Sequence, residues 1–332
     1  MHPFAYRSAT SAEEAVRMVA PMGPAGQGGA FLAGGTTVID LMKLSVLTPE
    51  SLTDIQALGL DEIEDDGETI RVGARVTMAQ AASDPTFRER APVLYDALWK
   101  AASPQLRNVA TLAGNVLQRT RCPYFRDNVS PCNKREPGSG CAAIGGINRL
   151  LAVLGTSENC IATYPGDWAN ALILFDAVVE TQSSEGGREI PFADLHVLPG
   201  DEPSRETVLG EDELILGYRI TVPAWARRSL YLKARDRESY AFAIASAAVA
   251  LDMEGDSVRE VRLALGGVAT VPWRARNAES FLAGETLSEE VAMEAGRIAF
   301  EGAQGYEHNA FKIPLGQRVV AKALLDAAAM QV

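Results

Sequence analysis

The four cysteines of this 332-residue chain fall within one stretch of the sequence, as Cys122, Cys132, Cys141 and Cys160. Four thiolates from one loop could hold an iron–sulfur cluster or a tetrahedral zinc ion, but the gaps between them are longer than the Cys-x-x-Cys knuckles of zinc ribbons. Two disulfides are an alternative that is disfavoured in a cytoplasmic protein of this size, and plain thiols are another. The spacing therefore favours an iron–sulfur site and leaves the other three interpretations open.

The segment 31–40, FLAGGTTVID, is a second candidate site. It predicts a strand that breaks at Gly34-Gly35, two hydroxyl side chains at Thr36 and Thr37, and a helix that follows. Glycines let backbone N–H groups approach a ligand, and a helix N-terminus attracts negative charge. The segment has neither a Walker loop nor a Rossmann fingerprint. It indicates a phosphate or pyrophosphate site, with an ordinary turn as the alternative.

Other polar positions could complete such a site: Thr111, Gly114, Asn115, Asp167 and Lys233. The first three surround a small-residue turn, and two such turns suit a ligand with two polar parts. Asp167 precedes an apolar helix, so capping that helix is its alternative role. Lys233 lies on an alternating strand, where an exposed edge lysine is the alternative. The histidines lie in unrelated contexts, and no catalytic residue is predicted.

The elements that must position these residues change character along the chain. A capping box at Ser11 and Glu14 predicts a helix, and a Gly/Pro loop leads into the opening strand. The expected helices span residues 12–20, 38–44, 77–82, 93–102, 278–282, 288–303 and 319–332. The expected strands span residues 31–33, 52–55, 63–67, 69–72, 178–180, 188–191, 214–222, 229–235, 241–252 and 258–266. The intervening stretches 21–29 and 119–149 are expected to be loops.

This pattern predicts an α+β protein of three parts: residues 1–57, residues 58–224 with the cysteine-bearing insertion at about 119–160, and residues 225–332. The net charge of −12 argues against nucleic acid as a partner. No apolar run reaches the ~20 residues of a membrane span. The start of the chain lacks the pattern of a signal peptide, so we expect a cytoplasmic protein, with export alongside a signal-bearing partner to the periplasm as the alternative.

Four segments resemble those that hold the flavin in the FAD subunits of the molybdenum hydroxylase (xanthine dehydrogenase) family: 31–40, 105–115, 166–172 and 231–235. The resemblance covers nearly the whole chain, and Ala113 departs from it where the family usually has glycine. It implies an FAD-binding, PCMH-like domain of two lobes. A smaller α+β domain would follow, similar to the C-terminal domain of CO dehydrogenase flavoproteins, with an antiparallel three-stranded sheet and helices.

The resemblance also assigns positions to FAD. Thr111, Gly114 and Asn115 would hold the polar middle of the cofactor, and Asp167 would contact a hydroxyl or a ring edge. Lys233 would place a positive charge near the isoalloxazine and favour the anionic reduced flavin. The first loop would offer N–H groups and hydroxyls to the diphosphate through Phe31, Leu32, Ala33, Gly34, Gly35, Thr36, Thr37, Val38 and Ile39.

The cysteine-bearing insertion is similar to that of periplasmic aldehyde oxidoreductases, heterotrimers whose FAD subunit carries an additional [4Fe–4S] cluster. This implies that Cys122, Cys132, Cys141 and Cys160 hold such a cluster. It also implies two partners, a molybdopterin-binding large subunit and a small subunit with two [2Fe–2S] clusters. Electrons would pass through FAD to an external acceptor. The sequence names neither the substrate nor the acceptor, which could be NAD, a ferredoxin, a quinone or oxygen.

Two other functions are compatible with parts of the sequence. A stand-alone FAD oxidoreductase of the vanillyl-alcohol oxidase or MurB type would have a related flavin fold and its own substrate, but no persuasive catalytic acid or base is present. A zinc-stapled binding protein with a vestigial nucleotide loop would need no redox group.

Overall fold

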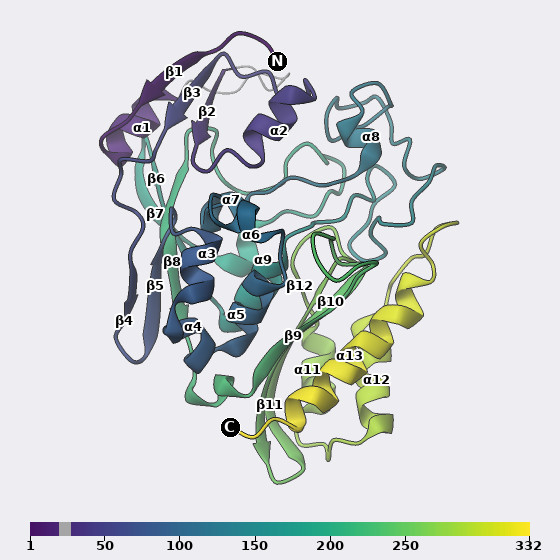
Figure 1. The fold of residues 1–332 in the computed structure, drawn as a ribbon. Coiled ribbons are helices and arrows are strands. Elements are labelled where there is room, and N and C mark those ends of the chain that lie inside the picture. The colour runs from purple at the N-terminus through teal and green to yellow at the C-terminus, as the bar shows by residue number, and fades with distance from the viewer. Residues whose placement is uncertain (20–27) are drawn as a thin grey trace.

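Three sheets organise the residues that the computed structural model describes, 1–19 and 28–332 (Figure 1). The first is parallel and three-stranded, in the order β1-β3-β2. The second is antiparallel and five-stranded, in the order β4-β5-β8-β6-β7. The third is antiparallel and four-stranded, in the order β12-β11-β10-β9. The predicted α+β class is therefore confirmed, while the division into three domains at residues 57 and 224 stays a prediction.

The N-terminal sheet consists of β1 (Ala5–Ser8), β2 (Gly29–Leu32) and β3 (Ser51–Asp54). Helix α1 (Ala12–Met18) begins as predicted, because Ser11 accepts the Glu14 N–H at 3.1 Å and the Glu14 carboxylate accepts the Thr10 N–H at 2.7 Å. Helix α1 ends earlier than predicted. Residues 21–27 of the predicted loop 21–29 lie outside the described residues. Helix α2 (Val38–Lys43) follows β2 as predicted, whereas β1 was not predicted.

The central sheet is held together by β8, which pairs with β5 on one side and β6 on the other. Its strands are β4 (Ile63–Asp65), β5 (Thr69–Gly73), β6 (Val178–Ser183), β7 (Gly186–Pro191) and β8 (Leu214–Thr221). The helices around it are α3 (Met78–Ser83), α4 (Pro85–Arg90), α5 (Pro92–Trp99), α6 (Pro104–Arg107), α7 (Leu112–Val116), α9 (Asp167–Leu172) and α10 (Phe192–Leu195). One apolar core joins this sheet to α3, α5 and α9.

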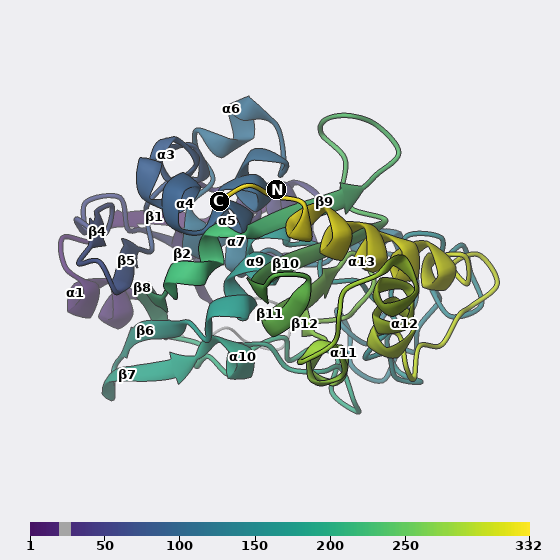
Figure 2. The same cartoon turned by 90° about the horizontal axis from the view of Figure 1, so that it is seen from below.

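The C-terminal sheet consists of β9 (Ser229–Ala234), β10 (Ala245–Glu254), β11 (Ser257–Gly266) and β12 (Trp273–Arg274). The predicted three strands were one too few, because the two-residue β12 is too short to leave a sequence pattern. Helices α11 (Arg276–Leu282), α12 (Glu289–Ala299) and α13 (Lys312–Ala328) cover one face (Figure 2). Strand β10 is buried on both faces, since Val249 packs under these helices while Ala248 joins the central core.

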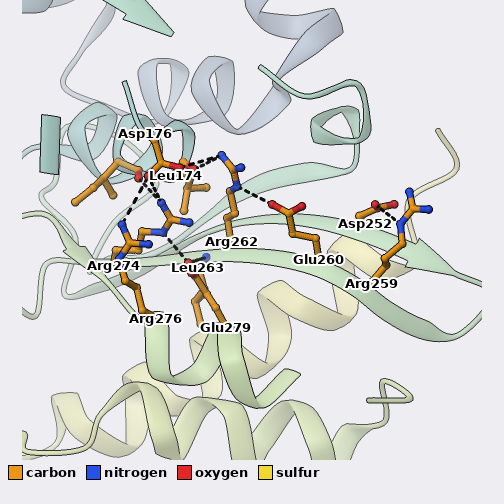
Figure 3. A network of polar contacts seen from close by, with 11 residues as sticks. Leu174, Asp176, Asp252, Arg259, Glu260, Arg262, Leu263, Arg274, Arg276 and Glu279 are labelled. Carbon is orange, nitrogen blue, oxygen red and sulfur yellow. Dashed lines mark hydrogen bonds and ion pairs between the residues drawn. The ribbon is translucent and has the colours of Figure 1, made fainter. Parts of the chain in front are cut away.

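Ion pairs connect the central part to the C-terminal sheet (Figure 3). Asp176 ends the short 3-10 helix η1 (Ile173–Phe175) with φ +46°. Its carboxylate lies 2.6 Å from the Arg274 guanidinium, 3.5 Å from that of Arg262 and 3.6 Å from that of Arg276. Arg262 also donates to the Leu174 carbonyl, and Arg274 donates to the Ile173 carbonyl of the same helix. The second 3-10 helix, η2 (Ala224–Arg227), leads from β8 into this sheet.

The insertion lacks regular structure, as predicted, apart from the four-residue helix α8 (Pro123–Arg126). Side chains from other segments hold its backbone. Lys312 is completely buried and donates to the Leu151 carbonyl at 2.9 Å, and burial lowers the pKa of its ammonium to about 7. Asn309 donates to the same carbonyl. The C-terminal helix region therefore anchors the insertion at Leu151.

Candidate cofactor sites

The two predicted flavin loops are in direct contact. A Cβ atom added to Gly34 would lie 2.0 Å from the carbonyl oxygen of Val109, which is far inside van der Waals distance. Gly34 is therefore needed because only a residue without a side chain lets the two loop backbones approach this closely. Gly35 has φ +71°, a left-handed conformation that also favours glycine. Helix α2 has only six residues, so the glycine backbone and the neighbouring hydroxyls define this turn more than a helix dipole does.

Two cavities meet at these loops. The first has a volume of about 270 Å³ and is mostly apolar, with Val19, Phe31, Ala33, Ile55, Ala74 and Leu214 in its wall. The second has a volume of about 540 Å³ and is more polar, with Asn115, Arg121, Arg126, Asp167, Tyr240 and Phe242 in its wall. Thr36, Thr37 and Gly114 border both. The two cavities adjoin at these three residues, and both cavities together are called the trough.

The trough brings together most, but not all, of the residues predicted to bind FAD. The first cavity is also bordered by Gly34, Gly35, Val38 and Thr111, and the second contains Asn115 and Asp167. Leu32, Ile39 and Lys233 border neither of these two cavities. The predicted turn at Thr111 is the start of helix α7, where the Thr111 hydroxyl accepts the Gly114 N–H at 3.2 Å.

Asn115 has an unused hydrogen-bonding atom in the second cavity. Its side-chain amide donates to the Met78 sulfur at 3.4 Å, and its Oδ1 atom is buried with no partner within the described part of the chain. A buried amide oxygen without a partner costs roughly 1–3 kcal/mol. An N–H group of a bound ligand would satisfy this atom, so the site fits a ligand with a donor at its polar edge.

Asp167 and Lys233 form a buried ion pair. Lys233 Nζ lies 2.7 Å from Asp167 Oδ2, and the two side chains are 1% and 6% exposed. The Tyr231 hydroxyl donates to Asp167 Oδ1 at 2.7 Å, and burial together with the nearby carboxylate raises the pKa of that tyrosine. Asp167 is the first residue of α9 and makes no capping bond, and Lys233 is not an exposed edge lysine. Both alternatives considered for these residues were therefore wrong.

Asp40 links the glycine loop to the insertion. Its carboxylate accepts hydrogen bonds from Arg121 at 3.0 Å and from Arg126 at 2.9 Å. Burial acts to raise the pKa of Asp40, but the charges of the two arginines outweigh it and hold the pKa below its ordinary value. Arg121 also lies over the Phe242 ring, 5.1 Å from its centroid. Arg121 and Arg126 belong to a stretch of the sequence that is rich in arginine and lysine, and only the fold pairs them with Asp40.

The four cysteines gather around one small pocket with Tyr124, Phe125, Lys134 and Ala143. All four are free thiols, and Cys122, Cys132 and Cys160 are buried. Cys132 and Cys141 face each other across an antiparallel bridge between two turns of the insertion. The disulfide alternative is therefore not found in the structure. Leu41 of α2 belongs to the same apolar cluster, so the thiols lie behind the helix that follows the glycine loop.

Two of the four thiols, those of Cys122 and Cys160, resist ionisation. Burial raises the pKa of Cys122 to about 12, and the neighbouring Cys132 and Cys160 add to this. Burial also raises the pKa of Cys160, which the Lys134 ammonium opposes. Within the described residues, no group of three or more His, Cys, Asp or Glu side chains converges tightly enough to hold a single metal ion. No described helix is both long and apolar enough to cross a membrane.

Comparison with known families matches both parts of the chain. Residues 2–225 match the family described as the FAD binding domain in molybdopterin dehydrogenase. Residues 230–327 match the C-terminal domain of the CO dehydrogenase flavoprotein. The two matches fall on either side of the connection between β8 and β9.

Individual relatives extend over nearly the full chain. The Escherichia coli (strain K12) protein named aldehyde oxidoreductase FAD-binding subunit PaoB is 46% identical over 304 residues, which cover 91% of this chain and 92% of the relative. The carbon monoxide dehydrogenase medium chain of Hydrogenophaga pseudoflava is 26% identical over 97% of this chain and 96% of its own.

Solved structures share the fold. Quinoline 2-oxidoreductase from Pseudomonas putida 86 matches with a TM-score of 0.74 and 24% identity over 98% of this chain and 97% of its own. Carbon monoxide dehydrogenase from Hydrogenophaga pseudoflava matches with a TM-score of 0.75 and 24% identity over 99% of this chain and 98% of its own.

The buried ion pair predicts a large stability effect. Replacing Lys233 by methionine should leave the Asp167 carboxylate buried and without its cation, which costs about 3–5 kcal/mol of unfolding free energy. Adding Asp167→Asn should restore part of the loss. The measurement is urea unfolding of each variant. Lys322→Met is the matched control, because that pair with Asp326 is exposed and should change stability by at most about 1 kcal/mol. Equal effects of the two lysine variants would contradict the prediction.

Proposed function

Because the chain belongs to the family of FAD-binding subunits of molybdopterin dehydrogenases, we propose that it is the FAD- and [4Fe–4S]-carrying electron-transfer subunit of a heterotrimeric aldehyde oxidoreductase. The chain is an oxidoreductase subunit of the molybdenum hydroxylase type. The choice of aldehyde over other substrates rests on the relative that is 46% identical, since the carbon monoxide and nicotine enzymes are only 25–26% identical.

The trough supports a specific placement of FAD. The diphosphate would lie at the junction of the two cavities, where Thr36 and Thr37 could donate to it and Gly114 adds no side chain. The adenosine end occupies the smaller, apolar cavity, and the isoalloxazine occupies the larger, polar one. The unpartnered Oδ1 atom of Asn115 carries this assignment, because an N–H group of the flavin ring would satisfy it.

Lys233 acts on this site through Asp167. Its ammonium donates to the Asp167 carboxylate and to the Lys100 carbonyl at 3.1 Å. The Asp167 carboxylate therefore partly neutralises the positive charge of Lys233. Asp167 is fixed in turn by Tyr231. The ion pair therefore orients a carboxylate oxygen of Asp167, a hydrogen-bond acceptor, toward the cofactor. The sequence resemblance had instead implied that Lys233 presents a free positive charge.

The thiol pocket supports a [4Fe–4S] cluster. Burial raises the pKa values of Cys122 and Cys160, and these two thiols would ionise when metal binds. Metal–thiolate bonds from the four cysteines would offset the cost of ordering a long loop. A four-iron cluster is larger than a single ion, so its ligand sulfurs attach at separate corners. The four cysteines line one pocket, as the ligands of such a cluster would.

When bound, FAD and the cluster would supply electron transfer. The chain's residues hold and separate these groups. Leu41 and the Asp40 pairs with Arg121 and Arg126 place the insertion against helix α2, between the trough and the thiols. Substrate oxidation belongs to a molybdopterin-binding large subunit, and a small subunit with two [2Fe–2S] clusters delivers the electrons. The external acceptor and the compartment, cytoplasm or periplasm with a signal-bearing partner, are not specified by these residues.

Gly35→Val should remove most of the bound FAD. The left-handed φ of +71° costs a residue with a side chain about 1–2 kcal/mol, and a Cβ atom would press on Ile39 at 3.1 Å. The loop should therefore shift away from the diphosphate position. Bound FAD per chain is measured by flavin absorbance after release from the folded protein. Gly145→Val is the control, because nothing lies within 4 Å of that position. Full FAD occupancy in a folded Gly35 variant would reject this placement.

Changing any one of Cys122, Cys132, Cys141 or Cys160 to serine should remove iron and loosen residues 119–160, while FAD remains at least partly bound. The purified wild-type chain should contain about four irons. Iron analysis and limited proteolysis are the measurements. Val129→Ser, at an exposed position of the same insertion, should keep its iron. Zinc in the wild type, or anaerobic protein without metal, would show that the cysteines serve another purpose.

The proposed partners predict an inactive isolated chain. A tagged copy expressed with its natural neighbours should copurify with a molybdenum-containing large subunit and a small iron–sulfur subunit. The complex should oxidise aldehydes, whereas the chain purified alone should not, because the substrate is oxidised at the molybdenum cofactor of another subunit. Aldehyde oxidation by the isolated, folded chain would instead support a stand-alone FAD oxidoreductase.

A further inference from the structure

A row of charged side chains joins the first cofactor cavity to the thiol pocket. Arg119 borders that cavity and donates through Nε to the Glu206 carboxylate. The other Glu206 oxygen lies 2.9 Å from Lys134 Nζ. Lys134 in turn borders the pocket that contains all four cysteines. Neither the sequence motifs nor the proposed cofactor contacts use these three residues.

The row is shielded from water and carries a net positive charge. The Lys134 side chain is 10% exposed, and those of Arg119 and Glu206 are 22% and 27% exposed. Burial acts to raise the pKa of Glu206, but the charges of Arg119 and Lys134 outweigh it, so its pKa lies below the ordinary value and the carboxylate is ionised at neutral pH. Two cations and one anion remain. Partly buried charges act more strongly on neighbours than exposed ones, because solvent screens them less.

Lys134 is fixed in position as well as in charge. Its ammonium also donates to the Pro203 carbonyl at 2.9 Å, so two partners from the 203–206 segment hold it beside the thiols. The neighbouring Arg135 does not border this pocket, and its guanidinium donates to the carbonyls of Tyr124 and Phe125. Arg121 is paired with Asp40 on the side of the second cavity. Lys134 is therefore the cation best placed to act on the thiol pocket.

We propose that Lys134 is a positioning residue that raises the reduction potential of the group held by the four thiolates, and that Glu206 limits this effect. The inference rests on the proposed iron–sulfur site. One-electron reduction adds one negative charge at the pocket, and a fixed ammonium beside it stabilises that charge. The Glu206 carboxylate opposes it. The two residues should therefore shift the potential in opposite directions.

The test is a redox titration of the purified protein with dithionite and mediators, with the EPR signal of the reduced cluster as the readout and the iron content measured in parallel. Lys134→Met should lower the potential, and Lys134→Arg should keep it close to that of the wild type. Glu206→Gln should raise it, because the two cations then lack their counter-charge. Lys322→Met is the matched control on the exposed face of α13 and should change nothing.

The opposite signs separate an electrostatic role from a structural one. A potential that moves the same way in Lys134→Met and Glu206→Gln, or that stays unchanged in both with full iron, overturns the inference. If Lys134→Met loses iron, the reduction potential of Glu206→Gln becomes the deciding measurement. An unchanged or lowered potential in that variant also overturns the inference. Absence of iron in the wild-type protein is a different result, because it rejects the proposed cluster itself and this inference with it.

Discussion

The contact between Gly34 and the Val109 carbonyl is the constraint on which the cofactor trough depends. The two loops come from different parts of the chain, and their backbones can touch only because Gly34 has no side chain. Their contact places Thr36 and Thr37 opposite Gly114, where the two cavities meet. Backbone packing therefore sets the position of a binding site for a long, two-ended ligand. The polar side chains around this site add hydrogen-bonding groups to it.

The insertion is organised by polar contacts in place of secondary structure. Asp40 holds it to α2 through two arginines, and Glu206 holds it to the 203–206 segment through Lys134. The Asn309 and Lys312 side chains hold its backbone at Leu151. Each of these contacts uses a side chain from outside the insertion. The thiols are thus gathered by the rest of the protein even before any metal is considered, and a bound cluster would add to an arrangement that is already specified.

Buried charge at both candidate sites is compensated by a specific partner. Asp167 is matched by Lys233, while the Lys134 ammonium is matched by Glu206 and a backbone carbonyl. Such pairs seldom increase stability over an apolar core, because desolvation offsets most of the attraction. Their value here is positional: a carboxylate beside the second cavity and a cation beside the thiols are each held in one orientation. The C-terminal domain supplies Lys233 and Tyr231, so it fixes the Asp167 carboxylate that borders the second cavity.

The sequence by itself determined the element types, the loop character of the insertion, the glycine turn and the grouping of the cysteines, because these depend on local periodicity, on backbone conformation and on spacing along the chain. It did not predict the short strands β1 and β12, which are stabilised by pairing with β3 and β11, nor the short helices α4, α6 and α10. Its alternative of an exposed edge lysine for Lys233 was wrong, and it identified no partners for Arg121, Arg126 and Lys134. Their partners Asp167, Asp40 and Glu206 lie 66 to 86 residues away along the chain. Pairing at such separations depends on how the sheets and loops pack, and only the tertiary structure decides it.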